Sequence, residues 1–93
     1  MPEYRPIQSR LGPLWLHRCA ALEEGPIWAR RERVVVDAGA NDSRVSFRGT
    51  SIRFHAHLFR EPDGLFRVSA KDQALYPAAL LTEIEQIVNS ALI

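Results

Sequence analysis

From Pro77 to the end of the chain, apolar residues recur at helical spacing, and this pattern limits the possible folds more than any other. Pro77 suits the first turn of a helix, where its missing N–H costs nothing. Polar residues fill the remaining positions, so one side of the helix should be buried. The apolar positions are Leu80, Leu81, Ile84, Ile87, Val88, Ala91 and Leu92. Such a helix needs an apolar surface to pack against, and the preceding segments should supply it.

Residues 43–48 and 51–60 alternate between apolar and polar residues, as expected of half-buried strands. A two-residue turn at 49–50, with glycine first, would pair Phe47 with Ile52. The apolar positions are Val45, Phe47, Ile52, Phe54, Ala56 and Leu58. The sequence therefore predicts an antiparallel hairpin with its apolar residues on one side.

A strong turn signal follows at 61–64, where proline presets one backbone angle and Gly64 can adopt a left-handed conformation. A three-residue loop would pair Leu58 with Val68 and Ala56 with Ala70, again apolar on apolar. Residues 65–71 are therefore predicted to form another strand.

Upstream, residues 33–38 contain three consecutive valines, and 39–42 resemble a turn. Pairing Val36 with Val45 and Val34 with Phe47 would add this strand to the hairpin. The predicted fold is α+β, a four-stranded antiparallel β-meander with the amphipathic C-terminal helix packed on one face.

The first thirty residues are ambiguous. Residues 13–24 have a broad apolar side and end before Gly25, which favours a short N-terminal helix, although the same stretch could form a strand. Residues 1–12 are expected to be an extended N-terminal arm. The length of 93 residues suits one domain, so residues 1–93 are taken as a single small α+β domain.

Composition indicates an ordinary globular protein, with 46% hydrophobic and 25% charged residues. No apolar run approaches the roughly 20 residues that cross a bilayer, so no membrane association is predicted. The single cysteine, Cys19, cannot form an internal disulfide, and the N-terminal residues do not resemble a secretion signal. A cytoplasmic location is expected.

Although the net charge is only +1, residues 43–71 are basic, with five arginines and a lysine against Glu61 and Asp63. The predicted meander places most of these cations on the sheet face opposite the helix, with one aromatic ring among them. The candidate binding residues are Arg44, Arg48, Arg53, His55, His57, Phe59, Arg67 and Lys71.

This surface predicts a small non-enzymatic interaction domain that binds a protein partner, possibly acidic, or a second copy as a homodimer, through the basic sheet face and adjoining strand edges. The alternative is a protein that binds single-stranded DNA or RNA, because cations can follow phosphates while Phe59 stacks on a base. A single aromatic residue is fewer than such platforms usually carry.

Catalytic and metal chemistry are weakly indicated. No phosphate loop, nucleophile elbow or paired-carboxylate motif is present, so neither an enzyme nor a cofactor is predicted. If 14–24 formed a strand, His17 and Cys19 could join His55 and His57 in a zinc site. Arg53 and Lys71 would repel such an ion, and no metal is predicted.

Overall fold

The computed structural model describes residues 3–20, 32–38 and 44–92. Seven strands and two helices form in these ranges. They are β1 (Glu3–Ser9), β2 (Gly12–Ala20), β3 (Glu32–Asp37), β4 (Val45–Phe47), β5 (Thr50–Ile52), β6 (His55–Arg60), β7 (Phe66–Val68), α1 (Ala70–Gln73) and α2 (Ala78–Leu92).

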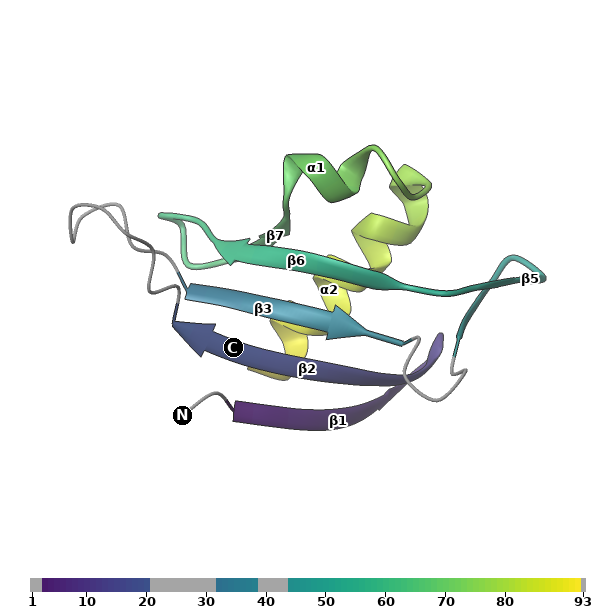
Figure 1. The fold of residues 1–93 in the computed structure, drawn as a ribbon, viewed down its shortest axis with the longest axis horizontal. Coiled ribbons are helices and arrows are strands. Elements are labelled where there is room, and N and C mark those ends of the chain that lie inside the picture. The colour runs from purple at the N-terminus through teal and green to yellow at the C-terminus, as the bar shows by residue number, and fades with distance from the viewer. Residues whose placement is uncertain (1–2, 21–31, 39–43, 93) are drawn as a thin grey trace.

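The main sheet has five antiparallel strands in the order β1-β2-β3-β6-β7, and β4 and β5 form a separate two-stranded sheet (Figure 1). The α+β class and the amphipathic C-terminal helix are confirmed, whereas the expectation of four strands is wrong. The arm expected over residues 1–12 contributes β1, and most of the expected N-terminal helix is strand β2. Residues 21–24 of that expected helix lie outside the described residues.

The first thirty residues misled sequence reasoning because β2 carries apolar residues on both of its sides. Leu14 and Leu16 are fully buried, while Trp15 and His17 are half-buried. Alternation of buried and half-buried residues is typical of a strand. Because Trp15 on the other side is also apolar, the sequence resembles the broad apolar face of a helix.

The hairpin β4-β5 differs from its prediction in register and in partner. Its turn is Arg48-Gly49, both at positive φ (51° and 79°), so Phe47 pairs with Thr50 rather than with Ile52. Positive φ at both central residues defines a type I′ turn, whose twist matches the flanking strands. β3 pairs with β6 instead of β4, bringing Val36 opposite Ala56. The turn predicted at 39–42 lies outside the described residues.

The hairpin β6-β7 agrees with its prediction at the turn. Leu58 pairs with Val68, and Gly64 has a φ of 88°, as the odd loop requires. The strand is shorter than expected, because it ends at Val68 and Ala70 begins α1. Ser69 ends the strand by capping α1, its side chain accepting a hydrogen bond from the Asp72 N–H.

Helix α2 covers one face of the main sheet and passes behind the strands in Figure 1, whereas α1 lies beyond the β6 and β7 edge. The buried side of the helix meets the inward side chains of the strands in one apolar cluster. The residues expected in this core all belong to it, with Ile87 only partly buried: Phe47, Phe54, Leu58, Val68, Ile84, Ile87 and Val88. This packing leaves the opposite face of the sheet free of described helices and strands.

Candidate functional site

The sheet face opposite α2 is here called the open face. It carries the side chains that alternate with the buried ones along each strand. Burial separates the two faces: Val34 and Val36 are fully buried, whereas Val35 between them is half-buried. By this alternation and the strand register, the open face carries Trp15, His17, Arg33, Val35, Asp37, His55, His57, Phe59 and Arg67.

The strand register arranges these residues in rows across the sheet. His17, Val35 and His57 form the middle row. Trp15, Asp37 and His55 form the row on one side, and the Nδ1 of His55 lies 3.6 Å from the Oδ2 of Asp37. On the other side, Arg33 pairs with Phe59, which pairs with Arg67. The middle row therefore holds one aliphatic and two imidazole side chains, and each flanking row combines an aromatic ring with charged side chains.

The candidate binding residues divide between two parts of the molecule. His55, His57, Phe59 and Arg67 lie together on the open face, and exposed Lys71 lies nearby in α1. Arg44, Arg48 and Arg53 instead belong to the β4-β5 hairpin and its flanks, at one end of the molecule (Figure 1). The single basic face expected from a four-stranded meander is therefore wrong for these three arginines, because β4 and β5 leave the main sheet.

Several cations of the sheet already have acidic partners. Arg67 donates to Asp63 at 2.9 Å, and the Leu65 N–H together with this guanidinium lowers the pKa of Asp63. Arg18 and Arg60 both donate to Glu32, at 3.0 and 3.2 Å. The hydrogen bond from Arg18 is the main reason that the pKa of Glu32 is lowered. Partial neutralisation makes the sheet less basic than its arginine count indicates.

His57 is half-buried, and its surroundings lower the pKa of its imidazole. Burial is the first reason that its pKa lies below 6.5, and His55, Arg33 and Lys71 lower it further, while Asp72 opposes them. The rings of His55 and His57 meet edge to face with centroids 5.5 Å apart. The neutral imidazole is therefore favoured at the centre of the open face.

Side chains close the sheet edge beyond β6 and β7. Asn89 accepts from the Phe66 N–H at 2.8 Å and donates to the Phe66 carbonyl at 3.1 Å, and Glu85 accepts from the Val68 N–H at 3.0 Å. Where β7 ends, Asp72 accepts from the His57 N–H at 2.9 Å. These contacts occupy the backbone groups that another strand would use.

The opposite edge is strand β1, which contains Pro6. Proline lacks an N–H and is found on edge strands, where it interrupts pairing with a further strand. The sequence predicts that strand edges take part in binding together with the sheet face. The closed β7 edge removes one of them, and Pro6 weakens the other.

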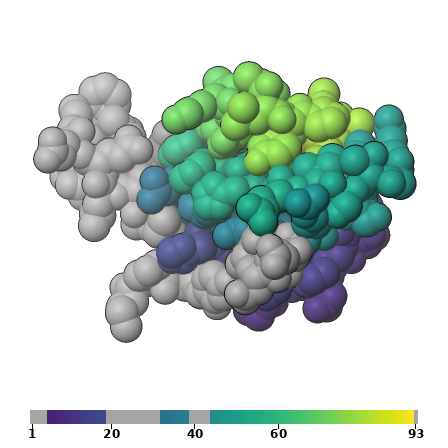
Figure 2. Space-filling model, turned by 45° about the vertical axis from the view of Figure 1, so that its right-hand side comes forward, coloured from purple at the N-terminus to yellow at the C-terminus, as the bar shows by residue number. Residues whose placement is uncertain are grey.

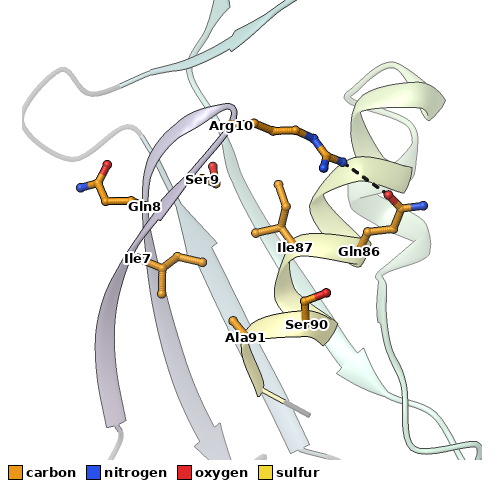
Figure 3. Close-up of a pocket in the computed structure, with 8 residues that line it drawn as sticks. All are labelled: Ile7, Gln8, Ser9, Arg10, Gln86, Ile87, Ser90 and Ala91. Atoms are coloured by element: carbon orange, nitrogen blue, oxygen red, sulfur yellow. Dashed lines mark hydrogen bonds between the residues drawn. The ribbon is translucent and has the colours of Figure 1, made fainter.

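Two hollows lie beside these elements. An open groove of about 670 Å³ separates the end of β1 from α2, where Ile7 and Ile87 point toward each other and Arg10 bonds Gln86 (Figure 3). A smaller hollow of about 380 Å³ is lined by Phe59 and Arg67, together with Ser69 and Gln73. Of these two, the smaller one includes residues of the open face.

The described residues contain no group of three or more histidine, cysteine, aspartate or glutamate side chains placed to hold a metal ion. His17 and His57 both pair with Val35, from opposite sides, so a strand separates them. The side chain of Cys19, the fourth ligand of the hypothetical zinc site, lies outside the described residues. Within the described ranges, no helix is long and apolar enough to span a bilayer.

Sequence reasoning missed the N-terminal half of the open face, namely Trp15, His17, Arg33 and Asp37. The alternation in β2 could have placed Trp15 and His17 on this face. Arg33 and Asp37 were missed because the pairing of β3 with β2 and β6 was not predicted. In the space-filling view, α1 and α2 form one side of the molecule and the purple N-terminal strands the other (Figure 2).

The chain matches no protein-family model, and no curated protein and no solved structure is significantly similar to it.

Proposed function

We propose that this protein is a small non-enzymatic interaction domain that binds a protein partner through the open face of its sheet. The observation that supports the proposal is the composition of that face at its centre. Trp15, Val35 and Phe59 are half-buried there, on the face of the sheet opposite the apolar core. Antiparallel sheets with one solvated face normally alternate apolar with polar residues, so large apolar groups on the second face indicate a contact surface.

The pattern of the face also fits protein recognition. Aromatic residues and arginine are enriched at protein interfaces, where a central apolar patch is ringed by polar groups. Here Val35 lies in the middle row, and each flanking row combines an aromatic ring with charge, Trp15 beside Asp37 in one and Phe59 between Arg33 and Arg67 in the other. An acidic partner would meet Arg33 and Arg67, and complementary charge would act mainly on the association rate.

Site-specific photo-crosslinking in cells that naturally express the chain tests this proposal. A benzophenone amino acid would replace Trp15 or Phe59 on the open face. Matched controls would carry it at Leu75 or Thr82, exposed positions on the helix side. We expect discrete protein adducts from the open-face positions and none from the controls. Adducts only from the controls, or none from the open face, would contradict the proposal.

A second function, binding of single-stranded nucleic acid, is favoured by the hollow that Phe59 and Arg67 share. A ring beside a guanidinium can stack on a base while the cation contacts phosphate. Electrophoretic mobility of labelled single-stranded DNA and RNA over a salt series separates the two functions. Micromolar binding that weakens steeply with salt and is lost in Phe59→Ala would favour nucleic acid. Unchanged mobility would leave protein binding as the function of this face.

A further inference from the structure

The central strand β3 presents three different chemistries in sequence on the open face. Arg33 is a cation, Val35 is aliphatic and Asp37 is a carboxylate, and the two charges flank the valine symmetrically. β3 is the third of five strands, so this pattern lies across the middle of the sheet. A pattern with opposite charges at equal distances from an apolar centre is complementary to itself after a half-turn.

We infer that the partner of the open face is a second copy of this chain, packed face to face about a two-fold axis that crosses β3 at Val35. The inference rests on the proposed function of that face and specifies its partner. Closed dimers place the same patch of both subunits in contact, so each contact occurs twice. With the axis running across the strands, the two β3 strands are antiparallel, and each Arg33 lies opposite Asp37 of the other copy.

The neighbouring rows agree with this axis. The middle row, which contains His17, Val35 and His57, would lie along the axis and meet itself. The row of Asp37 and His55 would meet the row of Arg33 and Phe59 from the other copy. His55 would then face Phe59, which pairs an imidazole with an aromatic ring. An axis along β3 would instead place Arg33 on Arg33 and Asp37 on Asp37, and the repulsion of like charges excludes that arrangement.

Distances in packed sheets allow the ion pairs to form. Residues four apart on a strand are separated by about 13 Å, so each charge lies about 7 Å from the axis. Face-to-face sheets are about 10 Å apart and cross at about 30°, which shifts opposed positions sideways by only about 3 Å. The long arginine side chain spans that offset. Asp37 already contacts His55, and its side chain keeps 35% exposure from which to accept a second cation.

The sheet edges favour a face rather than an edge as the contact. Asn89 and Glu85 occupy the backbone groups of β7, and Asp72 occupies the His57 N–H. Pro6 interrupts the β1 edge. A face of five short strands is small beside stable interfaces, which bury about 1,200 to 2,000 Å² in total. We therefore expect association in the micromolar range, near −8 kcal/mol for a dissociation constant of about 1 μM.

Charge exchange at residues 33 and 37 tests the inference. Sedimentation velocity would measure the dimer dissociation constant of the wild type, Arg33→Asp, Asp37→Arg and the double variant. Each single variant puts like charges opposite each other twice, and we expect its self-association to weaken by at least about tenfold. The double variant reverses both charges and should regain the wild-type constant within about threefold.

An equimolar mixture of the two single variants provides the decisive comparison. In the mixed dimer, the aspartate introduced at position 33 of one chain meets the arginine introduced at position 37 of the other. The unchanged Asp37 of the first chain meets the unchanged Arg33 of the second, so we expect heterodimers. Circular dichroism would verify that every variant is folded. A dilution series of ¹⁵N correlation spectra of the wild type needs no substitution, and its shifts should concentrate in β2, β3 and β6.

Three results would overturn the inference: a wild type that stays monomeric at millimolar concentration, single variants that dimerise normally, or a mixture that forms no heterodimer. These outcomes are distinguishable from failure of the proposed function. If the protein is monomeric but its open face still forms adducts with a different protein, the proposed function stands and only the identity of the partner is wrong.

Discussion

At the scale of single residues, the protonation of His57 on the open face makes the stability of the fold depend on pH. Its pKa is lowered mainly by burial, and the neighbouring cations Arg33 and Lys71 act in the same direction against Asp72. The folded state therefore takes up this proton at a lower pH than the unfolded state, whose imidazole titrates near pH 6.5. Stability is complete above that value and decreases as the pH falls through the folded-state pKa.

We predict that His57→Gln flattens the pH dependence of the unfolding free energy between about pH 7 and pH 5. Glutamine keeps the backbone N–H that donates to Asp72. Urea denaturation of both proteins at several pH values measures the difference, and His17 and His55 remain in both as an internal control. Equal pH slopes in the two proteins would show that His57 is not the responsible group.

At the scale of secondary-structure elements, α2 both covers the sheet and closes its edge. Asn89 bonds both backbone groups of Phe66, and Phe66 is only 1% exposed. Removing the amide would leave a buried N–H and a buried carbonyl without their partners, which costs about 1 to 3 kcal/mol.

We therefore predict that Asn89→Ala lowers the unfolding free energy by about 1 to 3 kcal/mol. Ser90→Ala is the matched control, because Ser90 is the next residue of α2 and is exposed, and surface changes stay within about 0.5 kcal/mol. Chemical denaturation gives both values, and faster hydrogen exchange at the Phe66 amide should accompany the loss. Equal stabilities of the two variants would mean that the edge contact contributes nothing.

The same element explains a limit of sequence reasoning about surfaces. Helical spacing places Glu83 and Glu85 on the solvent side of the helix, yet Glu83 lies 3.6 Å from Arg10 and Glu85 accepts from Val68. Spacing assigns a side chain to a helix face but does not say which backbone group lies within its reach. Glu85 is consequently unsuitable as a neutral control for binding experiments.

Elements with a local signal were predicted well. Helix α2 follows from apolar spacing along its whole length, and the turn at Gly64 from its own residues. Strand order failed, because pairing Val36 with Val45 or with Ala56 buries apolar groups equally well. Alternation fixes which side of a strand is buried, whereas the choice of neighbour depends on contacts distant in sequence.

The candidate site shows the same division. His55, His57, Phe59 and Arg67 were placed on one face correctly, since they lie on two strands joined by a recognisable turn. Arg44, Arg48 and Arg53 were misplaced with the hairpin that carries them. Trp15 and His17 were missed because their strand resembled a helix.

At the scale of the whole molecule, one sheet face is filled by α2 and one edge is closed by its side chains. Leu65 and Leu75 are exposed elsewhere on the described surface, and the open face carries the half-buried Trp15, Val35 and Phe59. Its charges alternate in sign along β3, so it can meet a partner, and in particular a second copy, without burying an unpaired charge.

Adduct formation from a benzophenone at position 59, compared in Val35→Glu and Ser51→Glu backgrounds, tests the role of the open face most directly. Both substitutions add one negative charge, but residue 35 lies at the centre of the face and residue 51 is exposed on the separate hairpin. We predict that Val35→Glu abolishes the adducts, because a desolvated charge without a partner opposes association, while Ser51→Glu preserves them. Equal adduct yields in the two folded variants would contradict the assignment of the open face as the binding surface.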